Sequence, residues 1–97
     1  ALRALRDTFV EVAFIATNGV SVERGLTTPD TAEATVKRAV VASAQRTVLL
    51  ADHTKVGNDC FARFADLADI DTFITDTGID AAVATDFAAA GPRVVRA

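Results

Sequence analysis

Three clusters of polar residues draw attention because each one directly follows a short apolar run. They are residues 17–19 (Thr-Asn-Gly), residues 52–55 (Asp-His-Thr-Lys) and residues 76–78 (Asp-Thr-Gly). Together they offer hydroxyls, an amide, carboxylates, backbone N–H groups beside glycine and a single ammonium. These groups suit a ligand that carries several hydroxyls and a phosphate. We therefore treat the three clusters as a candidate binding site.

Within these clusters, Lys55 is the sharpest candidate, since it follows an apolar run by four residues and stands beside the hydroxyl of Thr54. An ammonium suits phosphate as a point charge, but a solvated loop lysine gives the same pattern. Asp52 and Asp76 each follow an apolar run. A carboxylate there either holds the next turn or accepts hydrogen bonds from sugar hydroxyls, and turn formation is the first interpretation.

A further acidic candidate, Glu33, stands three residues after Asp30, which is the spacing of a capping box. We expect Asp30 to begin a helix and Glu33 to reach back to the backbone N–H of Asp30. Three alternatives remain for Glu33. It could accept hydrogen bonds from the ligand, act as a general base in an enzyme, or pair with Lys37 one turn later.

The remaining reactive residue types give no catalytic site, metal site or cofactor site. Cys60 is the only cysteine and is expected to be a small apolar side chain; a reactive thiol would need His53 nearby to activate it. His53 has no second histidine or clustered cysteine with which to bind a metal. The glycine-bearing loops lack the dinucleotide and Walker patterns, so no cofactor is predicted.

The overall composition is that of a small folded domain, or part of one. Hydrophobic residues make up 51% of the 97 residues and charged residues 24%. A net charge of -3 argues against binding nucleic acid through this segment. No apolar run approaches the roughly 20 residues that span a bilayer, so no membrane contact is expected. A single cysteine fits a reducing cytoplasm.

Short apolar runs predict four strands, at residues 10–16, 47–51 and 72–75 and at Val94-Val95. Because the first run is almost wholly apolar, we expect it to be covered on both faces. Helices are predicted at residues 1–8 (the end of one), from Thr31 onwards, at about 59–65, and from Asp80 to about Ala90.

The long helix from Thr31 is expected to turn one stripe to the core, formed by Ala32, Val36, Ala39, Val40 and Ser43. Alternation of strands and helices predicts an α/β fold with a Rossmann-like, mostly parallel sheet and flanking helices. Ligands bind beyond the carboxyl ends of the strands in such sheets, so the three polar clusters should share one edge.

In their order along the chain, several segments resemble the DeoR-type bacterial transcription regulators. The similar segments are residues 13–20 (AFIATNGV), 25–27 (GLT), Glu33 with 36–39 (VKRA), 50–57 (LADHTKVG) and 70–76 (IDTFITD). An Asp-x-Ser/Thr-Lys element followed at this spacing by Ile-Thr-Asp is fairly specific, whereas either alone is weak.

This resemblance implies a C-terminal sensor domain, similar in fold to ribose-5-phosphate isomerase, that recognises a phosphorylated sugar or a related metabolite. It further implies an N-terminal winged helix-turn-helix domain outside this chain, through which alone DNA is bound. Asn18 and Gly19 would line the pocket, and Lys55 would approach the phosphate. His53 departs from the small residue more often found there.

The resemblance also implies that an upstream strand with a phosphate-cradling turn is missing from this chain, and homo-oligomers are expected. The leading expectation is thus an effector sensor. A sugar-phosphate isomerase, with Glu33 as base and Lys55 holding phosphate, is the alternative, and a pure oligomerisation unit ranks third. The predicted effector-binding residues are Thr17, Asn18, Gly19, Glu33, Asp52, Thr54, Lys55 and Asp76.

Overall fold

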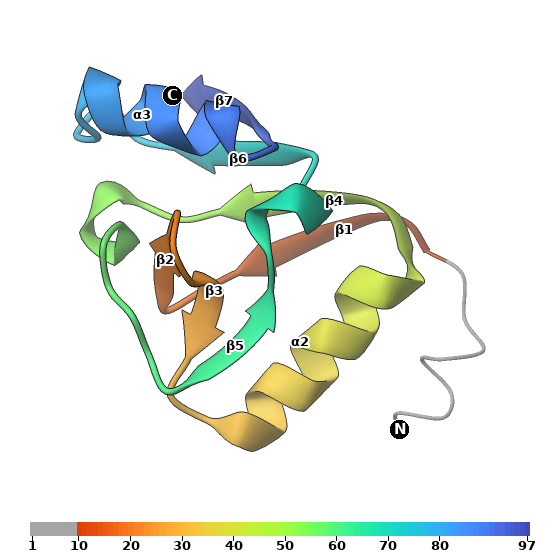
Figure 1. The fold of residues 1–97 in the computed structure, drawn as a ribbon. Coiled ribbons are helices and arrows are strands. Elements are labelled where there is room, and N and C mark those ends of the chain that lie inside the picture. Colours follow the sequence, from red (N-terminus) through yellow and green to blue (C-terminus); the bar gives the residue numbers. More distant parts are fainter. Residues whose placement is uncertain (1–9) are drawn as a thin grey trace.

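Two β-sheets enclose a common core in the computed structural model, which describes residues 10–97 (Figure 1). Sheet A is parallel throughout, in the order β1 (Val10–Ala16), β4 (Ala44–Leu50), β6 (Thr72–Thr75), β7 (Arg93–Arg96). Sheet B is antiparallel, in the order β2 (Gly19–Ser21), β3 (Gly25–Thr28), β5 (Ala62–Ala65). The predicted Rossmann-like, mostly parallel α/β fold is confirmed. The helix end predicted at residues 1–8 lies outside the described residues.

The apolar runs pair in register, which explains why they form one sheet. Ile15 lies opposite Leu49, Leu49 opposite Phe73, and Phe73 opposite Val94. Because side chains alternate along a strand, this row points to a single face of sheet A. Ile15, Leu49 and Phe73 are buried there.

Two α-helices are present among residues 10–97, α2 (Thr31–Ser43) and α3 (Ala81–Ala89), and each begins at an aspartate. Asp30 accepts a hydrogen bond from the N–H of Ala32 at 2.9 Å, and Asp80 accepts one from that of Ala82 at 3.2 Å. Both caps were predicted, as was the end of α3 just before Gly91-Pro92. Neither helix is long and apolar enough to cross a membrane.

The predicted apolar stripe of α2 is wrong for its first half. Ala32 and Val36 are exposed, whereas Ala34 is buried and Val41 packs against the core. The buried line therefore runs one or two positions away from the predicted one. With so many alanines and valines, the sequence of this helix offers several lines of similar hydrophobicity, and packing against β5 selects one of them.

The helix predicted at about residues 59–65 is also wrong, because residues 62–65 form strand β5. The connection from β4 to β6 contains β5 and two single 3-10 turns, at His53–Lys55 and Leu67–Asp69, and no α-helix. The regular alternation of strand and helix is thus broken in this connection. Strands β2 and β3 were not predicted at all.

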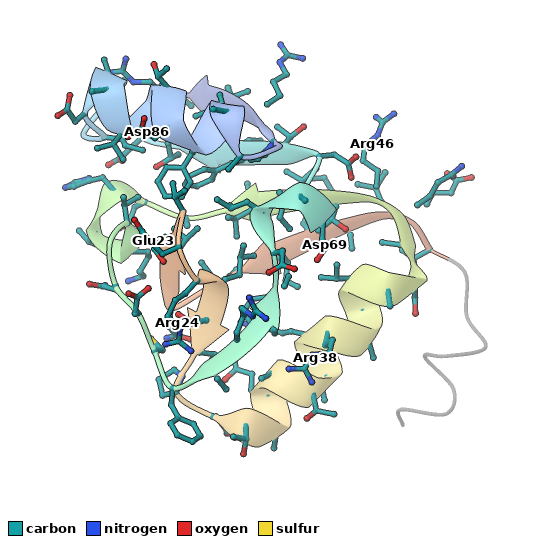
Figure 2. All side chains as sticks on the ribbon, viewed as in Figure 1. Glu23, Arg24, Arg38, Arg46, Asp69 and Asp86 are labelled. Carbon is teal, nitrogen blue, oxygen red and sulfur yellow. The ribbon has the colours of Figure 1, made fainter. Side chains whose placement is uncertain are left out.

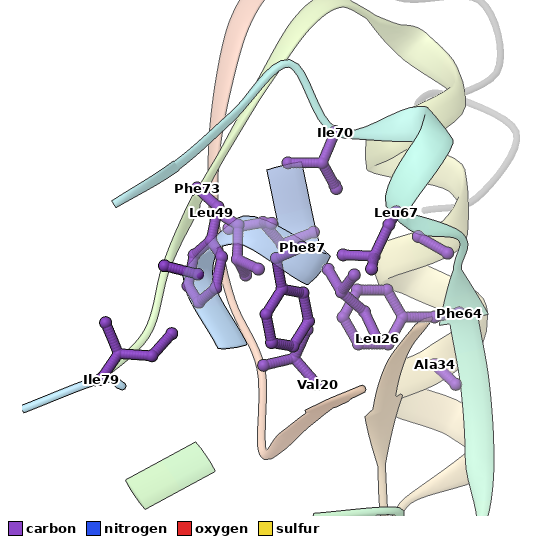
Figure 3. Packing of buried hydrophobic residues seen from close by; sticks show 13 residues of the cluster. Val20, Leu26, Ala34, Leu49, Phe64, Leu67, Ile70, Phe73, Ile79 and Phe87 are labelled. Atoms are coloured by element: carbon purple, nitrogen blue, oxygen red, sulfur yellow. The ribbon is translucent and has the colours of Figure 1, made fainter. Parts of the chain in front are cut away.

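The core lies between sheet A and the elements that connect its strands (Figure 3). Phe73 of β6 and Phe87 of α3 pack edge to face, with ring centroids 5.5 Å apart. Val20, Leu26 and Phe64 reach the same cluster from sheet B. In Figure 1, α2 flanks β5 and α3 lies against β6 and β7.

The opposite face of sheet A is uncovered by residues 10–97. Val12, Phe14 and Leu50 point to it, and their side chains are 40%, 67% and 43% exposed. We call this surface the open face of sheet A. Within residues 10–97, the cover expected on both faces of the first strand is therefore found on one face only. The reason is topological: strand order follows chain order, and right-handed crossovers then all fall on one side.

Candidate functional site

The carboxyl ends of β1, β4 and β6 lie at one edge of sheet A, because these strands are parallel neighbours. We call this edge, formed by residues 17–19, 52–55 and 76–78, the rim. One contact joins two of its turns, and a second joins the residues that follow residues 52–55 and 17–19. The His53 N–H donates to Asp76 Oδ1 at 3.0 Å, and the Gly57 N–H donates to the carbonyl of Val20 at 2.9 Å. The structure thus brings the three predicted clusters together.

His53 and Asp76 form the closest side-chain contact across the rim. Nδ1 of His53 lies 2.8 Å from Asp76 Oδ2, so Asp76 binds both the ring and the backbone of His53. The hydrogen bond from the His53 ring holds the pKa of the Asp76 carboxyl below its ordinary value. Gly78 makes room for this ring, since a Cβ there would lie 2.5 Å from His53 Nδ1.

Asp52 holds the turn that carries Lys55, which was the first interpretation for this residue. Its carboxylate accepts hydrogen bonds from the hydroxyl of Thr54 and, at 2.8 Å, from the Thr54 N–H. These two bonds, the hydroxyl first, keep the pKa of Asp52 below its ordinary value. Asp76, by contrast, uses its side chain to reach the neighbouring turn.

Lys55 is half-buried at the end of the 3-10 turn, and its backbone N–H donates to the carbonyl of Asp52 at 3.1 Å. Its ammonium has no ion-pair partner within 4.0 Å among residues 10–97. It therefore remains available to an anion. The Thr54 hydroxyl is already donated to Asp52 and keeps only acceptor capacity.

The turn after β1 mixes buried and exposed groups. Thr17 is buried, and its hydroxyl faces the carbonyl oxygens of Gly19 and Thr27 at 2.8 and 3.0 Å. Asn18 is exposed and accepts a hydrogen bond from the Thr28 hydroxyl at 3.1 Å. Thr17 is thus engaged inside the fold, while Asn18 remains exposed at this turn.

Gly19 is required by close packing of two backbones. A Cβ at this position would lie 2.3 Å from the carbonyl oxygen of Asn58. Any side chain would push apart the segments that follow β1 and β4, so glycine sets the spacing of this part of the rim.

Lys37 lies near the rim, although sequence reasoning treated it only as a partner for Glu33. Its ammonium lies 2.8 Å from the carbonyl oxygen of Ala16, the last residue of β1, and 3.0 Å from Glu33 Oε1. It also lies 5.2 Å from the ring centroid of Phe64. Glu33 therefore pairs with Lys37 and does not complete the expected capping box with Asp30. The i,i+4 spacing was the available signal.

Among residues 10–97, the other reactive groups do not gather into a second site. Cys60 is half-buried, and its carbonyl accepts a hydrogen bond from Arg24 at 2.6 Å (Figure 2). No cluster of three or more His, Cys, Asp or Glu side chains among residues 10–97 could hold a metal ion. A hollow of about 330 Å³, which Arg38 and Asp71 help to line, lies by the amino-terminal ends of β4 and β6. It is thus at the edge opposite the rim.

Comparison with known proteins finds one family and several transcriptional regulators that are similar to this chain. The DeoR C terminal sensor domain family matches residues 1–77. The HTH-type transcriptional regulator GlpR of Haloferax volcanii is 43% identical over 91 residues, which cover 94% of this chain and 36% of that protein. The HTH-type transcriptional repressor GlcR of Bacillus subtilis is 36% identical over 75 residues, covering 77% and 29%.

A third relative, the uncharacterized HTH-type transcriptional regulator FruR of Bacillus subtilis, is 41% identical over 64 residues, or 66% of this chain and 26% of that protein. The chain thus spans about a third of the length of the curated relatives that it matches. The matched region contains β1 to β6 and all the residues of the rim except Gly78. This chain belongs to the DeoR C terminal sensor domain family.

Proposed function

We propose that this chain senses a phosphorylated sugar or a related metabolite at the rim and thereby regulates transcription. DNA would be bound by a separate winged helix-turn-helix domain, in the cytoplasm, and the regulator would act as a homo-oligomer. The effector would bind one arrangement of the subunits more tightly than another, because only differential affinity shifts such an equilibrium. Repressor and activator are both compatible with this scheme.

The observation that carries the proposal is the convergence of three polar turns at the carboxyl edge of a parallel sheet. Small ligands bind at this edge in open α/β sheets. Asn18, Lys55 and Asp76 each come from a different turn, and the His53–Asp76 contact holds two of the turns together. A site assembled in this way can contact several groups of one ligand simultaneously.

Charges at the rim suggest which part of the ligand each residue meets. Asp52 and Asp76 have lowered pKa values and are therefore ionised acceptors at neutral pH, suited to sugar hydroxyls. Lys55 is the cation suited to a phosphate. One lysine beside two carboxylates does not neutralise a phosphate, so we expect further cationic or N–H groups for the phosphate to come from outside residues 10–97.

The direct test is a thermal-shift measurement with ribose 5-phosphate, glucose 6-phosphate and fructose 1-phosphate on the full-length regulator. A ligand that binds only the folded protein raises the melting temperature, by an amount that grows with the logarithm of the ligand concentration above Kd. The unphosphorylated sugars and inorganic phosphate are the control ligands. Stabilisation by a phosphorylated sugar alone supports the proposal, and no shift with any of them contradicts it.

Lys55→Ala is the decisive variant, because it removes the free ammonium from the rim. We expect it to abolish the shift, whereas Arg93→Ala, which removes an exposed cation at the opposite edge, should leave the shift unchanged. Thr54→Val tests the neighbouring hydroxyl separately. An unaltered shift in Lys55→Ala would exclude that lysine from the site.

We further propose that the chain is not an enzyme. In the isomerase alternative Glu33 would be the base, but its carboxylate lies 3.0 Å from the Lys37 ammonium and is held in an ion pair. The relatives compared above are named as transcriptional regulators or repressors. Turnover of ribose 5-phosphate by the full-length protein, lost in Glu33→Gln, would favour the enzyme; binding without turnover favours the sensor.

A further inference from the structure

One buried hydroxyl among residues 10–97 has no hydrogen-bond partner there. It belongs to Thr75, the last residue of β6, which is only 4% exposed. Three other buried threonines, Thr17, Thr27 and Thr28, all use their hydroxyls in hydrogen bonds. Buried polar groups are almost always hydrogen-bonded in native proteins. The lone hydroxyl of Thr75 therefore needs a physical reason.

Stability alone does not explain a threonine at this position. Valine has nearly the same shape and carries no group that loses its hydration on burial, so it would be the more stable residue in a buried strand. The positions one layer deeper in the sheet are apolar, since Leu49 and Phe73 fill them. Residues that break such a rule without a gain in stability are typical of functional sites.

Thr75 lies at the rim, on the core side of sheet A. Because side chains alternate along a strand, Thr75 points to the same face as Phe73 and away from the open face. Asp76, the next residue, is half-buried and belongs to the rim. The hydroxyl of Thr75 is thus one residue beneath the surface of the candidate site.

The neighbours of Thr75 leave a route for a ligand group. The adjacent residue at the end of β4 is Ala51, whose backbone N–H donates to the carbonyl of Ile74 and whose side chain has no polar atom to offer. Beyond the strand ends, the side chains of His53 and Asp76 are 47% and 43% exposed. A contact between such exposed groups contributes little to stability. A ligand at the rim can therefore reach the hydroxyl when this pair opens.

We propose that Thr75 contacts the effector, and that the group it meets is a sugar hydroxyl bound on the core side of the rim between β4 and β6. This inference rests on the proposed function. The Asp76 carboxylate can only accept hydrogen bonds, whereas the Thr75 hydroxyl can also donate one. A sugar hydroxyl satisfies both, because it donates to Asp76 and accepts from Thr75. A phosphate at this place would be repelled by the Asp76 carboxylate.

The test starts with Thr75→Val in the full-length regulator, titrated with ribose 5-phosphate, glucose 6-phosphate and fructose 1-phosphate. Without ligand, this variant should melt about 2 °C or more above the wild type, because it lacks the unpartnered hydroxyl. For the phosphorylated sugar that stabilises the wild type, its Kd should be about tenfold higher, because the hydrogen bond to the ligand is lost.

Thr75→Ser should show the opposite combination, since it keeps the hydroxyl and loses the methyl group. We expect it to melt below the wild type and to keep the wild-type Kd. Thr47→Val is the matched control and should also keep that Kd, because Thr47 is a buried threonine that lines the hollow opposite the rim. A role of Thr75 in stability alone cannot make the more stable variant bind more weakly than the less stable one.

Three results would overturn the inference, and they are distinguishable. A wild-type Kd in Thr75→Val removes Thr75 from the site, while the loss of the thermal shift in Lys55→Ala still supports the proposed function. A melting temperature of Thr75→Val below that of the wild type shows that the hydroxyl has a partner in the ligand-free fold. If no phosphorylated sugar stabilises the wild type, the proposed function fails and this inference fails with it.

Discussion

His53 has its tautomer set by Asp76. An ionised carboxylate can only accept a hydrogen bond, so the proton in the 2.8 Å contact lies on Nδ1 of the ring. Nε2 is then the remaining polar atom, an acceptor when the ring is neutral and a donor when it is charged. Since His53 stands at the rim, its protonation would change what this edge offers to a ligand.

At the same scale, the lowered pKa of Asp76 makes a prediction about acid stability. A carboxyl whose pKa is lower in the folded than in the unfolded chain stabilises the fold above its ordinary pKa, and this contribution disappears as the pH falls through the folded value. When the pH is lowered from 6 to about 3, the melting temperature of Asp76→Asn should therefore fall less than that of the wild type.

His53→Ala serves as the second arm of this experiment, because it removes the ring donor and leaves the carboxylate with the backbone N–H of residue 53. Melting followed by circular dichroism at each pH gives the comparison. Identical pH dependence in all three proteins would show that the contact contributes nothing to stability, as many exposed pairs do.

Helix α2 places Lys37 against the end of β1. The N-terminus of this helix is capped by one side chain, that of Asp30. Asp30 accepts hydrogen bonds from the backbone N–H groups of Ala32 and Glu33. Asp30→Ala should lower the free energy of unfolding by about 1 kcal/mol, the usual value of such a cap. Urea unfolding measures this change.

Asp86→Ala is the matched control, because Asp86 is an exposed aspartate within α3 and not at its start (Figure 2). It should change stability by less than about 0.5 kcal/mol. Equal losses in the two variants would mean that the Asp30 bonds do not stabilise the start of α2.

The elements that the sequence predicted well are those whose own residues determine their state. Long apolar runs such as Val10–Ala16 and aspartate-capped helices such as Thr31–Ser43 carry their signals locally. β5 carries the opposite signal, since two alanines and an arginine among its four residues favour a helix. Pairing with β3, more than thirty residues earlier, makes it a strand.

The candidate site likewise has one part that could be predicted from the sequence and one part that could not. Three polar turns at one edge were predictable, because parallel topology alone brings their strands' carboxyl ends together. The link between His53 and Asp76, residues 23 apart, and the approach of Lys37 to Ala16, 21 apart, were not. Those contacts depend on side-chain packing across turns whose shapes the pattern of residues does not specify.

At the scale of the whole molecule, strand position in sheet A predicts local stability. β4 and β6 have a hydrogen-bonded neighbour on each side, whereas β1 and β7 have only one within residues 10–97. We expect amide hydrogen exchange to be slowest in β4 and β6, which also supply Leu49 and Phe73 to the core. Exchange mass spectrometry on the 97-residue chain measures this order, and equally slow exchange in β1 would reveal an additional neighbour along its free edge.

The agreement between strand order and chain order has a consequence for how the domain is made. During synthesis the chain leaves the ribosome from its N-terminus, so each strand of sheet A emerges when the one it must join is already available. Growth proceeds outward from β1, and no earlier pairing has to open to admit a later strand. β7 (Arg93–Arg96) is the last strand to pair. A chain that stopped before it would leave β6 as an edge strand with unpaired backbone groups.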